Sequence, residues 1–236
     1  PIGRAADPGP EHDARFQAVR AAFGFVPAQL RWTPVGAARL RSLRAGELGV
    51  NESSSQYFED LIRTLDADQL EGRHPLNKSL YLCSKTMLPN RILTTLGDRV
   101  EMAHSIEARL PFLDHKVVEF LRGIPPDLKV RVSLRGGTEK HLLKEAARGL
   151  VTETLYRRKK HPFTAPPTRS SRRDPMSELV SDILHGSDMR NLDLYDQKKV
   201  LTLHDRSKSD GGSMSNLFLH LATLAIMQRR FGLSLA

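Results

Sequence analysis

The sequence predicts a mainly α-helical fold, and three observations support that fold class. Apolar residues recur at spacings of three and four along most of the 236 residues, the period of a helix with one buried face. Gly24, and Gly123 with the Pro125-Pro126 pair, are placed to end two of these segments, as is typical of helix termini. Only one short stretch alternates as a strand would, so we expect little sheet in this chain. No run of eighteen apolar residues occurs, and no membrane span is expected.

The first part of the chain, residues 1–52, is expected to hold an irregular start and short helices. Three prolines and two glycines among the first ten residues disfavour regular structure there. Gly24 is placed to end the first helix. The helices expected in this part are 11–23, with Phe16, Val19 and Phe23 on one face, and 34–43, with Leu40 and Leu43 inward.

The rest of the chain, residues 53–236, is expected to form the main helical part. Its first helix has a start signal, because Ser53 and Gln56 have the spacing of a capping box. Pro89 suits the first turn of a later helix, where its missing N–H is not needed. The helices expected up to residue 96 are one after Gln56 with Phe58, Leu61, Ile62 and Leu65 inward, one at 74–85 with Leu76, Leu80 and Cys83 on one face, and one at 88–96 with Ile92, Leu93 and Leu96 inward.

Helices also dominate the prediction for the C-terminal half. Gly123 and the Pro125-Pro126 pair should end one helix, and Thr138 can cap the next. The stretch 161–175, rich in proline and basic residues, is expected to be a mobile loop. The other segments expected are a helix at 113–121, an extended stretch at 128–132, a turn at 135–137, a helix from Thr138 to Arg148, helices at 176–184 and 197–204, an exposed stretch at 208–213 and a buried helix at 217–227.

The charge balance narrows the classes of partner. The chain has 36 basic and 27 acidic residues, a net charge of +9, which favours anionic partners. Nucleic acid would satisfy that excess, but the basic residues are scattered and no nucleic-acid-binding motif or zinc-ligand spacing occurs. A nucleotide polyphosphate satisfies it with fewer assumptions. The single cysteine, Cys83, fits a reducing cytoplasm, and a small buried hydrophobe explains it better than a nucleophile.

One stretch, residues 96–114, mixes charged and apolar side chains. If the apolar ones are buried, the charges must be paired, because an isolated buried ion costs several kcal/mol. Asp98 is expected to pair with Arg99 or Arg109, and Glu107 with one of the same arginines. Taken alone, the stretch predicts a structural cluster of ion pairs at a helix end. The apolar residues expected in the core are Leu96, Met102, Ala103, Ile106, Leu110, Phe112 and Leu113.

The same stretch resembles the signature of the asparagine synthetase family. The resemblance lies in Asp98-Arg99, in Met102-Ala103-His104-Ser105, and in the run Glu107-Ala108-Arg109-Leu110-Pro111-Phe112-Leu113-Asp114. A second block, Arg158-Lys159-Lys160-His161-Pro162-Phe163, is similar to the R-x-K-x-[G/P]-F loop of that family. Two blocks in the right order are more specific than either block alone. The similarity is clearest from about Ser79 to Phe163.

The resemblance implies the fold of a larger domain. In this family the synthetase domain is an α/β domain of the ATP-pyrophosphatase type, and its parallel sheet and S-G-G-x-D-S pyrophosphate loop lie upstream of the region matched here. Neither that loop nor the N-terminal cysteine of the family's glutaminase domain occurs in these 236 residues. The chain is therefore expected to be the helical C-terminal half of such a domain. Its start at Pro1, without an initiator methionine, also fits a fragment or a processed chain.

The resemblance also implies a reaction. Family members use ATP to activate a carboxylate as an acyl-adenylate, which an amine then attacks. Lys160 aligns with a family lysine that reaches the phosphates, and Arg99 with a basic residue near the substrate carboxylate, so both are expected to be catalytic. ATP and Mg²⁺ are expected to be bound mainly by the upstream half, and no metal site is expected in this chain. The residues expected in substrate-side or structural ion pairs are Asp98, Glu107, Arg109 and Asp114.

Arg99 also bears on the branch of the family. The lactam-forming synthetases have an acidic residue at its position, so the resemblance favours an amidotransferase that uses glutamine-derived ammonia, with aspartate as the default substrate. An ion pair with Glu107 or Asp98 explains Arg99 equally well. Amidation or cyclisation of a natural-product carboxylate stays open.

Two hypotheses of other classes accompany the ligase. In the first, the chain is a helical scaffold or binding subunit without the chemistry. In the second, it is a basic nucleic-acid-binding domain, which the absence of any nucleic-acid-binding motif disfavours. The partners implied by the resemblance are the upstream synthetase and glutaminase half and a small-molecule carboxylate, in the cytoplasm, and a homodimer is left open. Residues 164–175 are expected to become better ordered when nucleotide and the upstream half are present.

Overall fold

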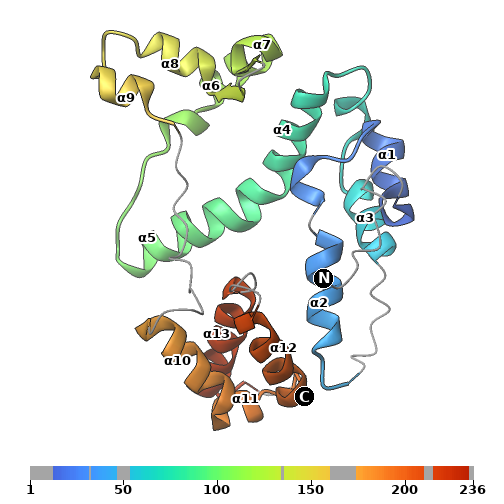
Figure 1. The fold of residues 1–236 in the computed structure, drawn as a ribbon. Coiled ribbons are helices and arrows are strands. Elements are labelled where there is room, and N and C mark those ends of the chain that lie inside the picture. Colours follow the sequence, from blue (N-terminus) through green and yellow to red (C-terminus); the bar gives the residue numbers. More distant parts are fainter. Residues whose placement is uncertain are drawn as a thin grey trace. The chain divides into compact units, whose positions relative to one another are not determined.

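The computed structural model shows a mainly helical chain, as the sequence predicts (Figure 1). It describes residues 13–31, 33–46, 54–133, 136–159, 174–209 and 215–233. Two compact units make up the chain, one combining Pro1–Arg31 with Ser55–Pro162 and the other combining Trp32–Ser54 with Phe163–Ala236. The division expected between residues 52 and 53 stays a prediction. No helix in the described part is both long enough and apolar enough to cross a membrane.

The first unit has its core where the N-terminal helices meet two later helices. Phe16, Val19 and Phe23 repeat at helical spacing and are all buried, as predicted. Val19 and Phe23 lie on the helix that ends at Gly24, and Phe16 lies just before its start. The φ of Gly24, 79°, lies in the left-handed region that favours glycine. The elements around this core are η1 (Ala14–Phe16), α1 (Gln17–Phe23), η2 (Ala28–Leu30), α3 (Ser54–Arg63), η3 (Ala67–Gln69) and α4 (Pro75–Lys85).

Helices α3 and α4 complete this core. Phe58 of α3 is fully buried and packs on Phe16, with ring centroids 4.9 Å apart. Leu82 of α4 is also fully buried. The face predicted for α4 is wrong in part, because Leu80 is 48% exposed. Apolar residues occupy two faces of this helix, so periodicity alone did not identify the face that the core would use.

A helical arm follows α4. The π-helix η4 (Leu88–Arg99) continues into α5 (Val100–Ala103), so the helix predicted at 88–96 exists but extends further. Pro89 lies in its first turn, as predicted. The prediction that Ile92 faces the core is wrong, since this side chain is exposed. Among the main contacts between described elements, η4 meets α4 and α5. After the arm come η5 (Pro111–Leu113) and α6 (His115–Gly123).

A two-stranded antiparallel sheet and short helices end the first unit. The extended stretch predicted at 128–132 is confirmed only from Val130 onward, because Leu128 and Lys129 end the helix α7. The second strand differs from the prediction. Thr138 pairs with Arg131 in the sheet instead of capping a helix, and Gly137 lies in the strand instead of a turn. Pairing of so glycine-rich a strand depends on its partner and not on local propensity. The elements are α7 (Pro126–Lys129), β1 (Val130–Ser133), β2 (Gly136–Glu139), α8 (His141–Ala146) and α9 (Glu153–Arg157).

The second unit is a cluster of helices with its own core. Val180, Leu184, Val200 and Leu221 are buried in it. The helices predicted at 34–43, 176–184 and 197–204 are confirmed, whereas the helix predicted to be buried all round at 217–227 buries one face and exposes Thr223. The elements are α2 (Thr33–Ser42), α10 (Pro175–His185), α11 (Ser187–Arg190), α12 (Gln197–Ser209) and α13 (Ser215–Phe231).

Two stretches far apart in the sequence meet in this unit. The backbone N–H of Asp196 donates to the carbonyl oxygen of Leu43 at 2.9 Å, and Arg44 pairs with Tyr195 in an antiparallel bridge. Lys199 Nζ donates to the carbonyl oxygen of Arg44 at 2.9 Å. These bonds attach the end of α2 to the start of α12, which places Leu43 in the core of the second unit.

The second unit also buries a histidine, His204 of α12. This residue is 8% exposed, and its ring lies edge-on to that of Phe218, with ring centroids 4.9 Å apart. Its Nδ1 has no hydrogen-bond partner in the described structure. Burial lowers the pKa of His204 below its ordinary value of 6.5. The charges of Lys208 and His185 act in the same direction, and that of Asp205 opposes them.

We expect His204 to make the chain less stable in mild acid. Because its folded pKa lies below 6.5, the unfolded chain takes up the proton first as the pH falls, and stability present above pH 6.5 is lost as the pH drops through the folded pKa. His204→Leu should remove much of this dependence, and the exposed His220→Leu should not. Melting followed by circular dichroism at about pH 7.5 and about pH 5.5 measures the effect. An equal loss of stability between the two pH values in the unchanged chain and in both variants would contradict the role of His204.

Candidate functional site

The residues of the first motif begin at the end of the helical arm. There the backbone N–H of Ile106 donates to the carbonyl oxygen of Glu101 at 2.9 Å, and that of Ser105 donates to Met102 at 3.1 Å. These two bonds form a Schellman cap. Ser105 takes the left-handed position, with φ of 55°, at a cost of about 1–2 kcal/mol for a residue with a side chain. The turn ends α5 and starts the segment that carries Glu107.

Only one of the ion pairs expected in this segment forms among the described residues. Arg109 Nη2 lies 3.1 Å from Glu107 Oε2, and the two side chains are 83% and 73% exposed. Such an exposed pair contributes about 1 kcal/mol at most. Asp98 and Arg99 are exposed at the end of η4, and neither has an ion-pair partner in the described part of the chain. The pairing expected for Asp98 is therefore wrong for this structure, and Arg99 is open to an anionic ligand.

Asp114 has a structural position at the start of α6. Its carboxylate Oδ1 accepts hydrogen bonds from the backbone N–H of Lys116 at 2.9 Å and of Val117 at 3.4 Å. An acidic residue here satisfies N–H groups that have no partner within the helix, which is typically worth about 1 kcal/mol. The contacts of Asp114 thus support the structural role that the sequence left open for it.

The apolar side chains of the same segment are exposed, so the prediction that they form core is wrong. Met102 and Ile106 are each 57% exposed, and Phe112 is 64% exposed. No described element of the first unit covers them, and apolar composition alone does not imply burial. Contiguous apolar surface of this kind often marks an interaction site. Three further members of the predicted core are exposed as well, namely Ala103, Leu110 and Leu113.

Lys160 lies outside the described residues, but the chain just before it is held on α8. Lys144 Nζ donates to the carbonyl oxygen of Arg158 at 2.9 Å. The Tyr156 hydroxyl donates to Glu145 Oε1 at 2.7 Å. These bonds join α8 to the end of α9 and fix the backbone two residues before Lys160.

Glu145 is the centre of this anchor. Its Oε2 lies 3.0 Å from Arg148 Nη2, and its Oε1 lies 3.9 Å from His141 Nδ1. The Tyr156 hydrogen bond holds the pKa of Glu145 below its ordinary value. Desolvation opposes this shift, and the charges of Arg148 and His141 add to it. The same network raises the pKa of Arg148. Sequence reasoning missed this network, because its members are spread over two helices and no motif marks them.

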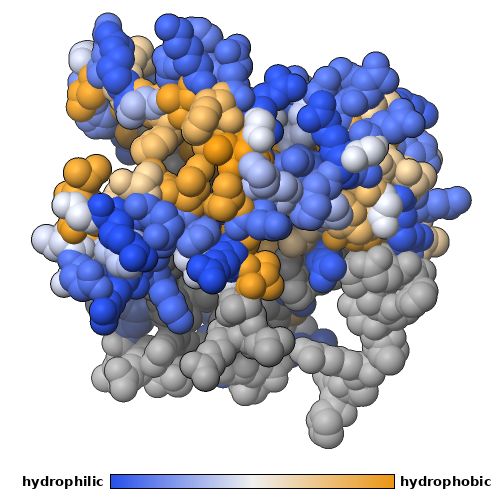
Figure 2. Space-filling view, turned by 90° about the horizontal axis from the view of Figure 1, so that it is seen from above, coloured by the Kyte–Doolittle hydropathy of each residue, from blue (hydrophilic) through white to orange (hydrophobic). Residues whose placement is uncertain are grey.

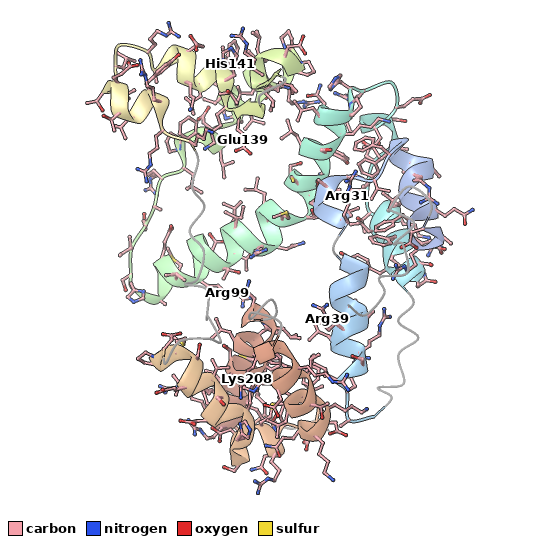
Figure 3. All side chains as sticks on the ribbon, in the orientation of Figure 1. Arg31, Arg39, Arg99, Glu139, His141 and Lys208 are labelled. Atoms are coloured by element: carbon pink, nitrogen blue, oxygen red, sulfur yellow. The ribbon has the colours of Figure 1, made fainter. Side chains whose placement is uncertain are left out.

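The described structure does not bring the surroundings of the two predicted catalytic residues into contact. Figure 3 shows Arg99 on the helical arm, and Glu139 and His141 at β2 and α8 next to the anchor of the second block. None of the main contacts between described elements joins the end of η4 to α8 or α9. A joint action of Arg99 and Lys160 on one substrate stays a prediction.

The described residues suit an anion better than a metal ion. No group of three or more histidine, cysteine, aspartate or glutamate side chains among them could hold a metal. Mg²⁺ is usually held by one or two carboxylates together with water and substrate phosphates. Exposed guanidinium groups such as those of Arg99 and Arg158 instead match phosphate and carboxylate oxygens.

Cys83 is half-buried, so the prediction of a small buried hydrophobe holds only in part. It lies on α4, and partial burial raises the pKa of its thiol. Gln29 Nε2 donates a hydrogen bond to its Sγ at 3.5 Å. A thiol with a raised pKa is mostly protonated near neutral pH, so it is a weak nucleophile.

Comparison with known proteins identifies the family. The model of the asparagine synthase family matches residues 10–229. The chain is 27% identical over 206 residues to Amidase chry2 of Gibberella zeae, which covers 82% of this chain and 30% of that protein. It is 32% identical over 134 residues to Amidase chyE of Penicillium rubens. This match covers 52% of this chain and 20% of that protein. It is 35% identical over 139 residues to asparagine synthetase (glutamine-hydrolysing) 1 of Bacillus subtilis. This match covers 57% of this chain and 21% of that protein.

These relatives are much longer than the region that they share with the chain. The chain spans between 20% and 30% of their lengths. No solved structure matches it. The family match includes both motif blocks, from Asp98 to Asp114 and from Arg158 to Phe163, and so confirms the resemblance found in the sequence. The chain belongs to the asparagine synthase family.

Proposed function

We propose that this chain supplies the helical C-terminal part of an ATP-dependent ligase that forms amide bonds. A carboxylate oxygen attacks the α-phosphate of ATP, pyrophosphate leaves, and ammonia then attacks the acyl carbon and releases AMP. The observation that carries the proposal is the family match over residues 10–229, which contains both motif blocks in order. ATP with its Mg²⁺ is assigned mainly to the sheet-bearing part of the domain, which in the family precedes the matched region.

Lys160 and Arg99 are the proposed catalytic residues of this chain. Lys160 is assigned to the phosphates, where negative charge shifts as the adenylate forms and pyrophosphate departs. The anchor between Lys144 and Arg158 supports this role, because a phosphate-binding side chain needs a backbone held in place. Arg99 is assigned to the substrate carboxylate. Its guanidinium supports that assignment, since it is exposed and has no ion-pair partner in the described part of the chain.

Aspartate and glutamine-derived ammonia are the proposed default substrates. The name of the Bacillus subtilis relative states glutamine hydrolysis and asparagine synthesis, while the two fungal relatives are named amidases. The three names have the amide bond in common, which leaves a different acceptor carboxylate as the alternative. A reducing, cytoplasmic location fits an ATP-using enzyme with a lone free cysteine, Cys83.

The proposed partner is the sheet-bearing, nucleotide-binding half of the synthetase domain. The exposed apolar side chains of Met102, Ile106 and Phe112 support it, since burying them against another part of the domain would stabilise the pair. Burial of apolar surface is worth about 25 cal/mol per Å². A helical scaffold without chemistry would use the same surface, so activity has to separate the two.

We expect the 236 residues alone to be unable to exchange pyrophosphate into ATP or to hydrolyse glutamine. The physical reason is that the phosphate loop and the nucleophilic cysteine of the family do not occur in them. Radiolabelled pyrophosphate is incubated with ATP, aspartate and either this chain or a complete protein that joins it to the family's upstream half. Exchange by the joined protein alone supports the proposal. Exchange by the isolated chain, or by neither protein, counts against it.

A further inference from the structure

An apolar groove lies in the first unit between α4 and the helices that follow the first motif. It has a volume of about 1230 Å³. Leu80 of α4 lines one wall, Phe120 of α6 lines the opposite wall, and Leu143 of α8 contributes to the lining. These three side chains are 48%, 67% and 43% exposed, so the groove is open to solvent. Figure 2 shows apolar surface gathered in a hollow between hydrophilic surfaces.

A polar contact ties the two sides of the groove together. Lys129 Nζ, at the end of α7, donates to Asn77 Oδ1 of α4 at 3.0 Å. Partial burial lowers the pKa of Lys129, which is the effect of placing an ammonium group among apolar side chains. Helix α7 also contacts α8, so the contact links α4 to the whole sheet-and-helix region. One hydrogen bond thus joins the two sides of the groove.

The size and shape of the groove fit a helix better than a small molecule. Pockets for small ligands usually have volumes of about 300–1,000 Å³ and enclose most of the ligand. The volume of about 1230 Å³ lies above that range. Two helical walls with an apolar floor are also the usual form of a groove that accepts an amphipathic helix.

The rim of the groove is basic. Among its lining residues, the basic ones are Arg73, Lys85, Arg122, Lys129 and Lys140, and the acidic ones are Asp66 and Glu139. Arg122 and Lys140 have no side-chain partner among the described residues. The net charge of the chain is +9, so a second copy would be repelled from this rim. Charge complementarity therefore favours an acidic occupant.

We propose that this groove binds an amphipathic helix of a partner protein. The apolar stripe of that helix packs on Leu80, Phe120 and Leu143, and acidic side chains beside the stripe face Arg122 and Lys140. Apolar contact supplies affinity, and the basic rim selects an acidic partner over a basic one. This surface goes beyond the ligase chemistry, since none of these side chains is assigned to ATP or to the carboxylate. It shares Phe112 with the surface assigned above to the sheet-bearing half.

A designed peptide tests the proposal directly. The probe is a fluorescein-labelled helix of about 18 residues with leucine at every third and fourth position and mostly glutamate elsewhere. Anisotropy titration with the 236-residue chain should show saturable binding. Phe120→Glu should weaken binding at least about tenfold, because it places a carboxylate on the apolar wall. The matched control is Leu150→Glu, which adds the same charge at an 84% exposed leucine outside the groove and should leave binding unchanged.

The rim is tested with charge. Arg122→Glu should also weaken binding of the acidic peptide and make that binding less dependent on salt concentration. The reason is that the substitution removes an electrostatic attraction that salt ions screen. A second peptide with the same leucines and lysine in place of glutamate should bind far more weakly. Circular dichroism of each variant checks that it is folded, which is expected because Phe120, Arg122 and Leu150 are all exposed.

Other outcomes would overturn the proposal. No saturable binding of the acidic peptide, equal binding of both peptides, or equal losses in the Phe120 and Leu150 variants would each exclude a helix site in the groove. Laurate that binds more tightly than the peptide, with the loss confined to Phe120→Glu, would assign the groove to a small apolar acid. Dimerisation of the chain in sedimentation runs, abolished by Phe120→Glu, would assign it to a second copy.

Discussion

Replacing Lys160 with alanine in the complete protein is expected to lower adenylate formation about a hundredfold, with little change in the Michaelis constant for the carboxylate. Lys160 is assigned to charge that develops as pyrophosphate departs, and interactions that strengthen in the transition state appear in turnover and not in ground-state binding. Loss of one such charged donor typically costs on the order of 3 kcal/mol. Pyrophosphate exchange at varied carboxylate concentration measures both quantities.

The neighbouring Lys159 is the matched control for this change. It is an exposed member of the same basic run, so Lys159→Ala should alter the rate by less than about fivefold, equivalent to about 1 kcal/mol. Both variants remove the same charge from the same loop. If they prove equally harmless, the alignment of the second block is wrong and the scaffold hypothesis takes precedence.

Replacing Phe58 with alanine should destabilise the chain by about 3–5 kcal/mol, the usual cost of removing a fully buried aromatic side chain. Phe58 is fully buried against Phe16, and its loss leaves a cavity between α3 and η1. A typical domain is stable by about 5–15 kcal/mol, so the first unit should lose much of its stability. Urea denaturation followed by circular dichroism measures the free energy of unfolding.

Phe120→Ala provides the contrast within the same unit. This phenylalanine is 67% exposed on α6, so its removal should change stability by about 0.5 kcal/mol or less. A loss comparable to that of Phe58→Ala would mean that the groove side of α6 is packed in solution. It would also argue against an open docking surface there.

Much of the fold could be predicted because local patterns determine it. Phe16, Val19 and Phe23 have one helical period, and a glycine follows them where a left-handed residue is needed. The same logic held for Pro89 at the start of η4 and for the inward Leu43 at the end of α2. These features need only a few neighbouring residues to specify them.

Other features depend on contacts that no local pattern contains. Thr138 became part of a strand because β1 lies beside it, although its type equally suits a helix cap. Ile106 and Phe112 are exposed because no described element covers them, although their composition resembles core. The Schellman turn at Ser105 was missed because glycine is the usual signal for it.

The candidate site was predicted by resemblance and only partly by physical pattern. The charges of Asp98 and Arg99 were expected to be paired, and the structure leaves them exposed without ion-pair partners in the described part. Glu107 and Arg109 form the expected pair, at 3.1 Å. The hydrogen bond from Tyr156 to Glu145, which joins α9 to α8 just before the second block, could not be predicted. Helical periodicity assigns both side chains to the surface and does not indicate which polar side chains meet.

The central claim is activation of a carboxylate as an acyl-adenylate, and transfer of ¹⁸O tests it most directly. The complete protein is incubated with ATP, ammonia and aspartate labelled with ¹⁸O in its side-chain carboxylate, and the nucleotide products are analysed by mass spectrometry. The carboxylate oxygen that attacks the α-phosphate stays on that phosphorus when the amine displaces AMP. The account predicts one ¹⁸O in each AMP and unlabelled pyrophosphate. Label in inorganic phosphate with ADP as the product, or no transfer with any carboxylate offered, would contradict it.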